Sequence, residues 1–263
     1  MESYTPYTAY RSITVEVSEG VATITFHDPE NYNPISTDVI LDLQRAFHEI
    51  KLDRDIDVVV ITGEGEDAFS SGGDVREYAG PADQHVPQEK QRGDIYFETW
   101  KLLYDLHPVT IAKINGYCVG GGLILAAYCD LAVSVDDAKF GLPTANIGTT
   151  PDDGSTYRLT ELIGERAVKE MVFTADLIDA AEAHRLGLVN DVVAREELDE
   201  AVSALIDRIQ SNAMGAVKHS KQAINFSAQS TDLDTAREHE DDVWWKQFRT
   251  DEREQRVDQF LDG

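Results

Sequence analysis

Three short, continuously apolar runs constrain the fold of this 263-residue chain more than any other feature. They lie in DIDVVVITGEG (residues 55–65), PVTIAKI (residues 108–114) and DLAVSV (residues 130–135), and helical patterns separate them. A strand that is apolar on both sides is typical of a parallel sheet covered on both faces, because a half-exposed strand alternates apolar and polar residues. The order of strands and helices therefore predicts an α/β fold with parallel strands and right-handed crossovers.

The N-terminal part adds a hairpin and a helix to this pattern. Residues 12–26 alternate apolar and polar around Ser18-Glu19-Gly20, which predicts a β-hairpin. Residues 37–50 have apolar positions at helical spacing, with Ser36 as the expected N-cap. Residues 80–93 are polar and predict a loop, followed by a helix over residues 94–106.

From about Gly154 onward the chain is mostly helical, and it ends in a very acidic helical tail that carries the pair Trp244-Trp245. We expect that pair to lie in the core or at a subunit contact. No repeat and no clear linker divides the chain. We therefore expect an α/β core over residues 1–200 and a helical region over residues 201–263, which serves oligomerisation and covers a pocket.

The charge of the chain limits its partners. Against 49 acidic residues there are 23 basic ones, giving a formal net charge of -26. This excess argues against nucleic acid or an anionic membrane as a partner. The N-terminal stretch is polar and no apolar run reaches the ~18 residues that span a bilayer. We expect a cytoplasmic protein whose two cysteines, Cys118 and Cys129, are buried reduced thiols, and no metal site.

Two glycine-bearing turns follow predicted strands: AFSSGGDVREY (residues 68–78) and NGYCVGGGLILAAYCD (residues 115–130). Glycines at a strand-to-helix turn let backbone N–H groups point at a ligand oxygen, and the helix N-terminus adds partial positive charge. Two such turns side by side can form an oxyanion hole. A phosphate loop needs a lysine after the last glycine, and none follows either turn. The alternative is that the glycines only permit close packing.

Four consecutive segments resemble the crotonase superfamily, the enoyl-CoA hydratase/isomerase family. They are AFSSGGDVRE, NGYCVGGGLILAAYCDLAVSVDDAKFGLP, IGTTPDDGSTYRLTELIG and AAEAHRLGLVNDVV, and the likeness extends from about Ile13 to Phe226 with order and spacing kept. The resemblance implies a crotonase-like spiral of ββα units and a homotrimer or dimer of trimers. It also implies acyl-CoA thioester substrates. No separate cofactor is implied, because coenzyme A is part of the substrate.

The same resemblance assigns site residues. It implies that the backbone N–H groups of Gly73 and Gly121 hold the thioester oxygen. Arg76 corresponds to a position that is often basic near the CoA phosphates; the alternative is an ordinary surface arginine. Tyr32 lies in the loop that matches the CoA-lining loop of the family. The polar segment ending at Gly93 corresponds to the variable loop over the acyl pocket.

The acid–base residues separate the chemistries within the family. Hydratases resemble one another in two glutamates that position and activate water, and the matching positions here are Ile124 and Thr144. Neither side chain can act as a general base at neutral pH. Asp152 matches an aspartate that some isomerases use as a proton-shuttling base and some dehalogenases use as a nucleophile. The alternative for Asp152 is a helix N-cap, and its neighbour Asp153 is the stronger cap candidate.

The expected function is an acyl-CoA-processing enzyme, with an enoyl-CoA isomerase favoured over a hydratase. One base suffices to move a double bond by proton shuttling, whereas adding water needs more. The alternatives are a hydratase that uses another acid–base pair, a hydrolase acting on a β-keto or ring acyl-CoA, and a non-catalytic protein that binds CoA thioesters.

The acidic residues are spread along the whole chain, which resembles the surface bias of proteins from salt-loving organisms. We predict that the thermal unfolding midpoint rises steeply as KCl increases from about 0.1 M to molar concentration, because salt screens the repulsion between carboxylates. Circular dichroism melts at each salt concentration measure this. A midpoint that is flat or falls with salt would contradict the hypothesis.

Overall fold

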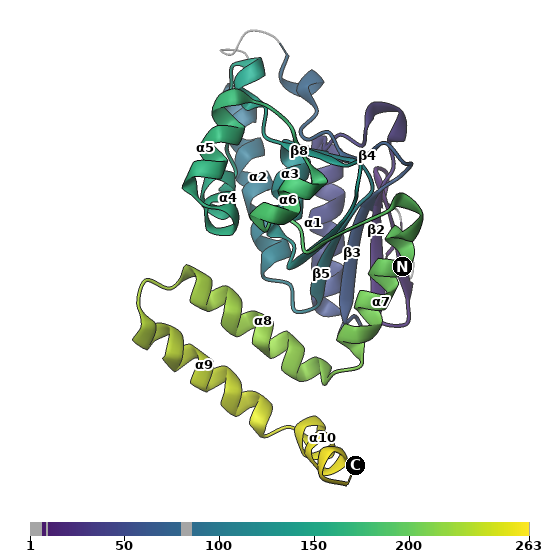
Figure 1. Ribbon diagram of the computed structural model, residues 1–263, viewed down its shortest axis with the longest axis vertical. Coiled ribbons are helices and arrows are strands. Elements are labelled where there is room, and N and C mark those ends of the chain that lie inside the picture. The colour runs from purple at the N-terminus through teal and green to yellow at the C-terminus, as the bar shows by residue number, and fades with distance from the viewer. Residues whose placement is uncertain (1–6, 9, 80–85, 263) are drawn as a thin grey trace, which may run out of the picture.

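The larger of two sheets contains the strands that the apolar runs predict (Figure 1). A computed structural model of the chain describes residues 7, 8, 10–79 and 86–262. The sheet has six strands in the order β1-β2-β3-β5-β7-β10. They are β1 (Ile13–Ser18), β2 (Val21–Phe26), β3 (Val58–Gly63), β5 (Val109–Ile114), β7 (Leu131–Val135) and β10 (Asp191–Val193). The hairpin β1-β2 is antiparallel and all other neighbours are parallel, which confirms both predictions.

A second sheet of four short strands lies in the order β4-β6-β8-β9. Its strands are β4 (Ala68–Ser70), β6 (Tyr117–Val119), β8 (Lys139–Gly141) and β9 (Ile178–Asp179). Strand β4 follows β3 along the chain, β6 follows β5, and β8 follows β7. The core therefore repeats a strand, a short strand and a helical segment, as the resemblance implies. Because β4, β6 and β8 are parallel, their carboxyl ends meet at one edge.

Ten α-helices cover the sheets or extend from them in the described part of the chain. They are α1 (Thr37–Leu52), α2 (Val86–Tyr104), α3 (Gly121–Tyr128), α4 (Ser155–Ile163), α5 (Glu165–Thr174), α6 (Ala180–Leu186), α7 (Leu198–Gln210), α8 (Met214–Gln229), α9 (Leu233–Phe248) and α10 (Asp251–Asp262). Helix α1 begins as predicted, since the Ser36 side chain accepts a hydrogen bond from the Val39 N–H. Helix α3 is apolar all round and almost wholly buried, which is typical of a central helix.

The predicted loop over residues 80–93 is wrong in its second half. Helix α2 begins at Val86, and residues 80–85 lie outside the described residues. Pro87 stands in the first turn of this helix, where a missing N–H costs nothing. Glutamine, glutamate, lysine and arginine then follow, and all of these are good helix formers despite their polarity. The described part of the segment that the resemblance matches to the variable loop is therefore helical.

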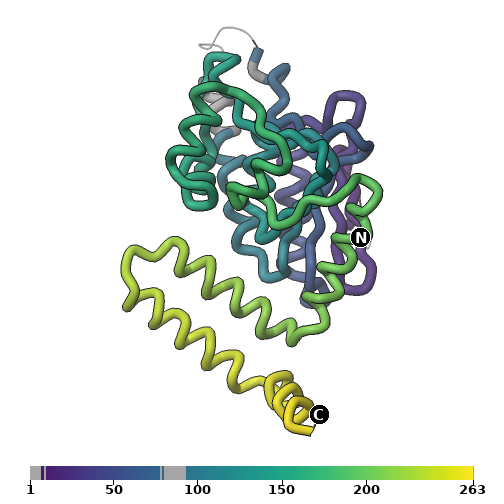
Figure 2. Tube along the Cα trace, viewed as in Figure 1, coloured from purple at the N-terminus to yellow at the C-terminus, as the bar shows by residue number. Residues whose placement is uncertain are grey.

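The C-terminal helices α8 and α9 run side by side below the core, and α10 follows at the end (Figure 2). The acidic tail forms two helices, α9 and α10, because Thr250 interrupts it and accepts a hydrogen bond from the Arg253 N–H. Trp244 and Trp245 are about half exposed and pack with Phe248 on α9. They are therefore not core residues, and the subunit contact stays a prediction.

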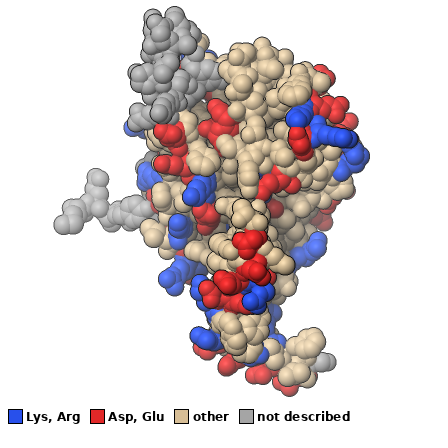
Figure 3. Space-filling view, turned by 90° about the vertical axis from the view of Figure 1, so that its left-hand side faces the viewer, with Lys and Arg blue, Asp and Glu red and all other residues tan. Residues whose placement is uncertain are grey.

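Acidic side chains are spread over the face in Figure 3, from the core to the C-terminal helices, with basic ones between them. Both cysteines are buried and free, as predicted, and burial raises the pKa of each thiol. Within the described residues, no helix combines the length and the apolar character that a membrane span requires.

One buried ion pair fastens the C-terminal helices to the core. The Lys221 ammonium group on α8 donates to the Pro108 carbonyl at 2.8 Å and pairs with the Asp130 carboxylate at 2.6 Å. That carboxylate also accepts from the N–H and the hydroxyl of Thr110 on β5. The Lys221 side chain is only 7% exposed, so each charge depends on the other for its neutralisation.

We predict that Lys221→Met lowers the free energy of unfolding by roughly 3 kcal/mol, because it leaves the partly buried Asp130 carboxylate without its counter-charge. Chemical denaturation measures this. The matched control is Lys218→Met on the same helix, whose ion pair with Asp57 is more exposed and whose loss should cost less than half as much. Equal effects of the two variants would contradict the assignment.

Candidate active site

The two glycine-bearing turns lie against each other at the carboxyl edge of the small sheet. The first follows β4 and the second follows β6, and these strands are parallel neighbours. An ideal Cβ built on Gly121 would lie 3.3 Å from the Gly73 amide nitrogen. A Cβ on Gly72 would lie 2.8 Å from the Gly121 amide nitrogen. Side chains at these positions would fill the space beside both N–H groups.

The local backbone leaves both amides available to a ligand. Around Gly73 a parallel bridge forms with Ile35, in which the Ile35 N–H donates to the Gly72 carbonyl and the Asp74 N–H donates to the Ile35 carbonyl. In a parallel bridge, the residue between the two bonded neighbours points its own N–H away from the partner strand. The Gly73 N–H therefore points away from Ile35. The Gly121 amide is the first of helix α3, where no intrahelical acceptor exists. Both donors therefore suit one shared oxygen.

The remaining glycines of these turns serve packing, so the packing alternative holds for part of the motif. Gly120 has φ +56°, which other residues rarely adopt, and its N–H donates to the Gly141 carbonyl. A Cβ on Gly122 would lie 2.7 Å from Ser70 Cβ, so α3 approaches β4 too closely for a side chain. Within the triple glycine, Gly120 makes the turn, Gly121 carries the candidate amide donor, and Gly122 allows α3 to pack closely on β4.

Two buried asparagines hold the chain where it passes between the sheets, and sequence reasoning missed them. The Asn115 amide group donates to the carbonyls of Gly63 and Gly65 at 2.9 and 2.8 Å. The Asn33 amide group donates to the carbonyls of Glu64 and Ala68 at 3.0 and 2.8 Å. Asn115 begins the second glycine-bearing turn, and Asn33 follows Tyr32 in the loop that matches the CoA-lining loop. Their positions in these two segments were the only sequence signal that pointed to them.

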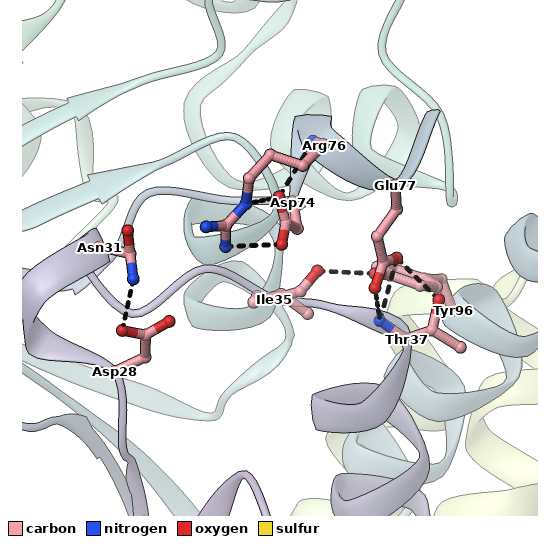
Figure 4. A network of polar contacts seen from close by, with 8 residues as sticks. All are labelled: Asp28, Asn31, Ile35, Thr37, Asp74, Arg76, Glu77 and Tyr96. Atoms are coloured by element: carbon pink, nitrogen blue, oxygen red, sulfur yellow. Dashed lines mark hydrogen bonds and ion pairs between the residues drawn. The ribbon is translucent and has the colours of Figure 1, made fainter. Parts of the chain in front are cut away.

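A short polar network fixes the segment that follows the first glycine turn (Figure 4). The Asp74 carboxylate accepts from the Arg76 N–H and so caps the 3-10 turn Val75–Tyr78. Glu77 accepts from the N–H and the hydroxyl of Thr37 at the start of α1. The Tyr96 hydroxyl donates to the Ile35 carbonyl at 2.7 Å. These contacts join α1, α2 and the first glycine turn.

Arg76 lies in this network, and its charge is largely taken up by a neighbour. Its guanidinium group makes two parallel hydrogen bonds to the Asp74 carboxylate, each of 2.8 Å. The side-chain hydrogen bond and charge of Asp74 raise the pKa of Arg76. Arg76 lines a hollow of about 200 Å³ together with Arg11, His27 and Asp28.

Tyr32 lines a different cavity, which adjoins both glycine turns. This cavity has a volume of about 400 Å³, and Ser71 and Val119, which precede the two turns, lie in its wall. The Tyr32 ring packs edge-to-face on Tyr117, with 6.1 Å between ring centroids. The Tyr32 carbonyl accepts from the Ser71 N–H at 2.9 Å, which ties its loop to the first turn. The structure thus places Tyr32, but not Arg76, in the wall of the cavity that Ser71 and Val119 also line.

The positions that match the hydratase glutamates carry no carboxylate. Ile124 is 4% exposed and lies one helical turn after Gly121 on α3. Thr144 begins the 3-10 turn Thr144–Ile147 after β8. Its hydroxyl is buried, and the described residues provide no hydrogen-bond partner for it.

Asp152 lies in the turn before α4, with an exposed side chain. Neither Asp152 nor Asp153 is the N-cap of α4: Gly154 occupies that position, and no side chain caps the helix. The turn packs beside Tyr128 at the far end of α3, because a Cβ on Gly154 would lie 2.6 Å from the Tyr128 hydroxyl oxygen. Ile124 lies between Gly121 and Tyr128 on one face of that helix.

Comparison with known proteins agrees with this geometry. A family model described as enoyl-CoA hydratase/isomerase matches residues 16–262. The chain is 34% identical over 254 residues to a crotonyl-CoA hydratase of Syntrophomonas wolfei, covering 97% of this chain and 96% of the relative.

Two solved structures share the fold over nearly the whole chain. An enoyl-CoA hydratase from Bacillus anthracis has a TM-score of 0.90 at 30% identity and covers 96% of both chains. A putative enoyl-CoA hydratase from Thermobifida fusca, solved in complex with CoA, has a TM-score of 0.82 at 32% identity, covering 90% of this chain and 93% of that one. Paired glycine turns, the two-sheet spiral and full-length similarity agree: the chain belongs to the enoyl-CoA hydratase/isomerase family, the crotonase family.

Proposed function

We propose that this member of the family is an enoyl-CoA isomerase that moves a double bond along the acyl chain. The observation that carries the proposal is a pair of facing backbone amides beside a helix whose next turn presents buried Ile124 in place of a carboxylate. Asp152 is the base in this proposal, and Gly73 and Gly121 are the oxyanion donors.

The proposed reaction needs only one base and two amides. With the thioester oxygen of a 3-enoyl-CoA bound to the Gly73 and Gly121 N–H groups, Asp152 removes a proton from C2. The negative charge of the resulting dienolate rests on the thioester oxygen, where the two donors stabilise it. Asp152 then returns the proton to C4, so a C2–C3 double bond replaces the C3–C4 bond and no atom is gained or lost.

Substrate binding follows from the two cavities beside the turns. The CoA complex of the Thermobifida fusca relative supports CoA as the carrier here. In the proposal Tyr32 lines the pantetheine channel, and Arg76 lies nearer the phosphates, where it must divide its hydrogen bonds between Asp74 and the ligand. We place the reaction in the cytoplasm.

The assembly in this proposal is a homotrimer or a dimer of trimers built through the C-terminal helices. Leu233 on α9 and Phe260 and Leu261 on α10 are 74–84% exposed in the single chain. Exposed apolar side chains along these helices favour burial against another copy. A second copy would also exclude water from Asp152, which is exposed in the single chain.

A hydratase is the second candidate, and the names of the relatives favour it. A 3-enoyl-CoA and a 2-enoyl-CoA, offered separately in high salt, distinguish the two through the absorbance of the conjugated thioester. The proposal expects absorbance to appear from the 3-enoyl substrate and to persist with the 2-enoyl one. Rapid loss of the 2-enoyl signal would establish hydration and refute the isomerase assignment.

We predict that Gly121→Ala lowers kcat by about 10²–10³, because the new methyl group lies beside the Gly73 amide and obstructs the oxyanion. Initial rates on the 3-enoyl-CoA measure this. Titration with free CoA, which lacks the thioester oxygen, is the control and should give unchanged affinity. Full activity in the variant would exclude this turn as the oxyanion site.

We predict that Asp152→Asn lowers kcat by about 10²–10⁴ with little change in KM, because the amide cannot accept the proton. The matched control is Asp153→Asn, the adjacent carboxylate with the same change in charge, which should keep near-normal activity. If the two variants lose activity equally, the effect is electrostatic or structural and Asp152 is not the base.

A further inference from the structure

A small aromatic cavity lies at the far end of α3 from the oxyanion turn. Its volume is about 220 Å³. Its wall is formed by Phe97, Lys101, Tyr104, Tyr128, Tyr157, Arg158, Glu161 and Gln229. Four of these side chains are aromatic, and they come from α2, α3 and α4.

The cavity is aligned with the candidate active site along one helix face. Gly121, Ile124 and Tyr128 are spaced as i, i+3 and i+7, so they share a face of α3. Seven residues of α-helix span about 10.5 Å. The aromatic cavity therefore lies within the reach of a short acyl chain whose thioester is bound at the glycine turns. The turn that carries Asp152 borders the same end, through the contact between Gly154 and Tyr128.

The shape of the wall suits a flat ring. The Tyr104 and Tyr128 rings are perpendicular, with centroids 6.2 Å apart, which leaves a ring face and a ring edge for an aromatic partner. Burial raises the pKa of both phenols, so they stay neutral. A cavity of roughly 150 Å³ is enough to hold benzene, so this one accommodates a phenyl group.

The charged groups of the wall largely satisfy one another. Arg158 Nε donates to the Ala127 carbonyl at 2.8 Å, and the guanidinium group lies over the Tyr104 ring, 5.0 Å from its centroid. A second nitrogen of Arg158 lies 3.7 Å from a Glu161 carboxylate oxygen. The remaining charge, Lys101, has an exposed side chain. The wall therefore offers no strong site for an anionic acyl terminus.

Tyr104 and Gln229 close the cavity at its outer end. The two side chains lie next to each other in the wall, and the Tyr104 carbonyl accepts from the Asn225 amide group on α8 at 2.9 Å. Both residues also line a groove of about 710 Å³ that runs between the end of α2 and the α8–α9 pair. One tyrosine ring and one amide therefore separate a ring-sized cavity from a space large enough for a long chain.

We infer that Tyr104, with Gln229 beside it, is the end wall of the acyl site and selects short acyl groups that end in a phenyl-sized ring over long alkyl chains. The inference rests on the proposed function, because it takes the acyl chain to start at Gly73 and Gly121. It makes Tyr104 a specificity-determining residue rather than a catalytic one.

Binding of saturated acyl-CoA esters tests the inference without requiring turnover. The ligands are butanoyl-CoA, 4-phenylbutanoyl-CoA, dodecanoyl-CoA and glutaryl-CoA, titrated calorimetrically into the full chain in high salt. We expect 4-phenylbutanoyl-CoA to bind about tenfold or more tightly than butanoyl-CoA, from burial of the ring, and dodecanoyl-CoA to gain less. Tighter binding of dodecanoyl-CoA or glutaryl-CoA than of the phenyl ester would overturn the inference.

Two variants locate the selectivity at the end wall. Tyr104→Ala should abolish the phenyl preference and raise affinity for dodecanoyl-CoA about tenfold, because the cavity then opens into the groove. The matched control Tyr104→Phe keeps the ring and should keep the preference. If Tyr104→Ala does not fold, the exposed Gln229→Ala must show the same gain for dodecanoyl-CoA. An unchanged ligand order in the folded variant refutes the assignment.

The titrations and the absorbance assay on 3-enoyl-CoA together separate this inference from the proposed function. A protein that shows the phenyl preference but leaves every 3-enoyl-CoA unchanged refutes the isomerase and supports the end wall. A protein that isomerises 3-enoyl-CoA but binds the butanoyl and phenyl esters equally refutes the end wall alone. Failure to bind any ester refutes both.

Discussion

The hydrogen bonds of two buried asparagines set the geometry on which the candidate active site depends. Where the chain leaves the large sheet and enters the small one, the side-chain amides of Asn33 and Asn115 donate hydrogen bonds to the carbonyls of Gly63, Glu64, Gly65 and Ala68. An unsatisfied buried carbonyl would be costly, so the crossing adopts one conformation. Strands β4 and β6 can then run parallel in fixed register, and the two glycine turns that follow them meet.

From this constraint the chemistry divides into two kinds of group. The proposed oxyanion donors are backbone amides, so they are set by the fold and by the absence of side chains at Gly72 and Gly121. The proposed proton-transferring group, Asp152, is a side chain on a separate turn, before α4. In the proposed mechanism the fold keeps the stabilising donors constant, and the side chains at positions such as Ile124, Thr144 and Asp152 decide where a proton can go.

Much of the fold could be predicted from the sequence, because its long strands and helices have clear periodicity. The hairpin, the apolar strands β3, β5 and β7, and the N-cap at Ser36 were all identifiable. The small sheet was not, since strands of two or three residues contain too few side chains to show a pattern. The start of α2 was missed because its first turns are polar, and the loop prediction gave polarity more weight than helix propensity.

For the candidate site, the sequence identified the glycine turns by their motif. It could not place Arg76 beside Asp74 in a two-bond pair, nor show that Tyr128 and Tyr104 close a cavity, because those depend on tertiary contacts.

The acidic surface in Figure 3 has a kinetic consequence for any CoA ester. Many enzymes draw charged substrates toward their sites through an opposite field, and salt slows that encounter. Here both the ligand and the protein are strongly anionic, and Arg76 already shares its charge with Asp74. Association is therefore opposed by a long-range repulsion that mobile cations remove, so the encounter rate rises with ionic strength. Concentrated salt would then act as a condition for rapid substrate capture as well as for a stable fold.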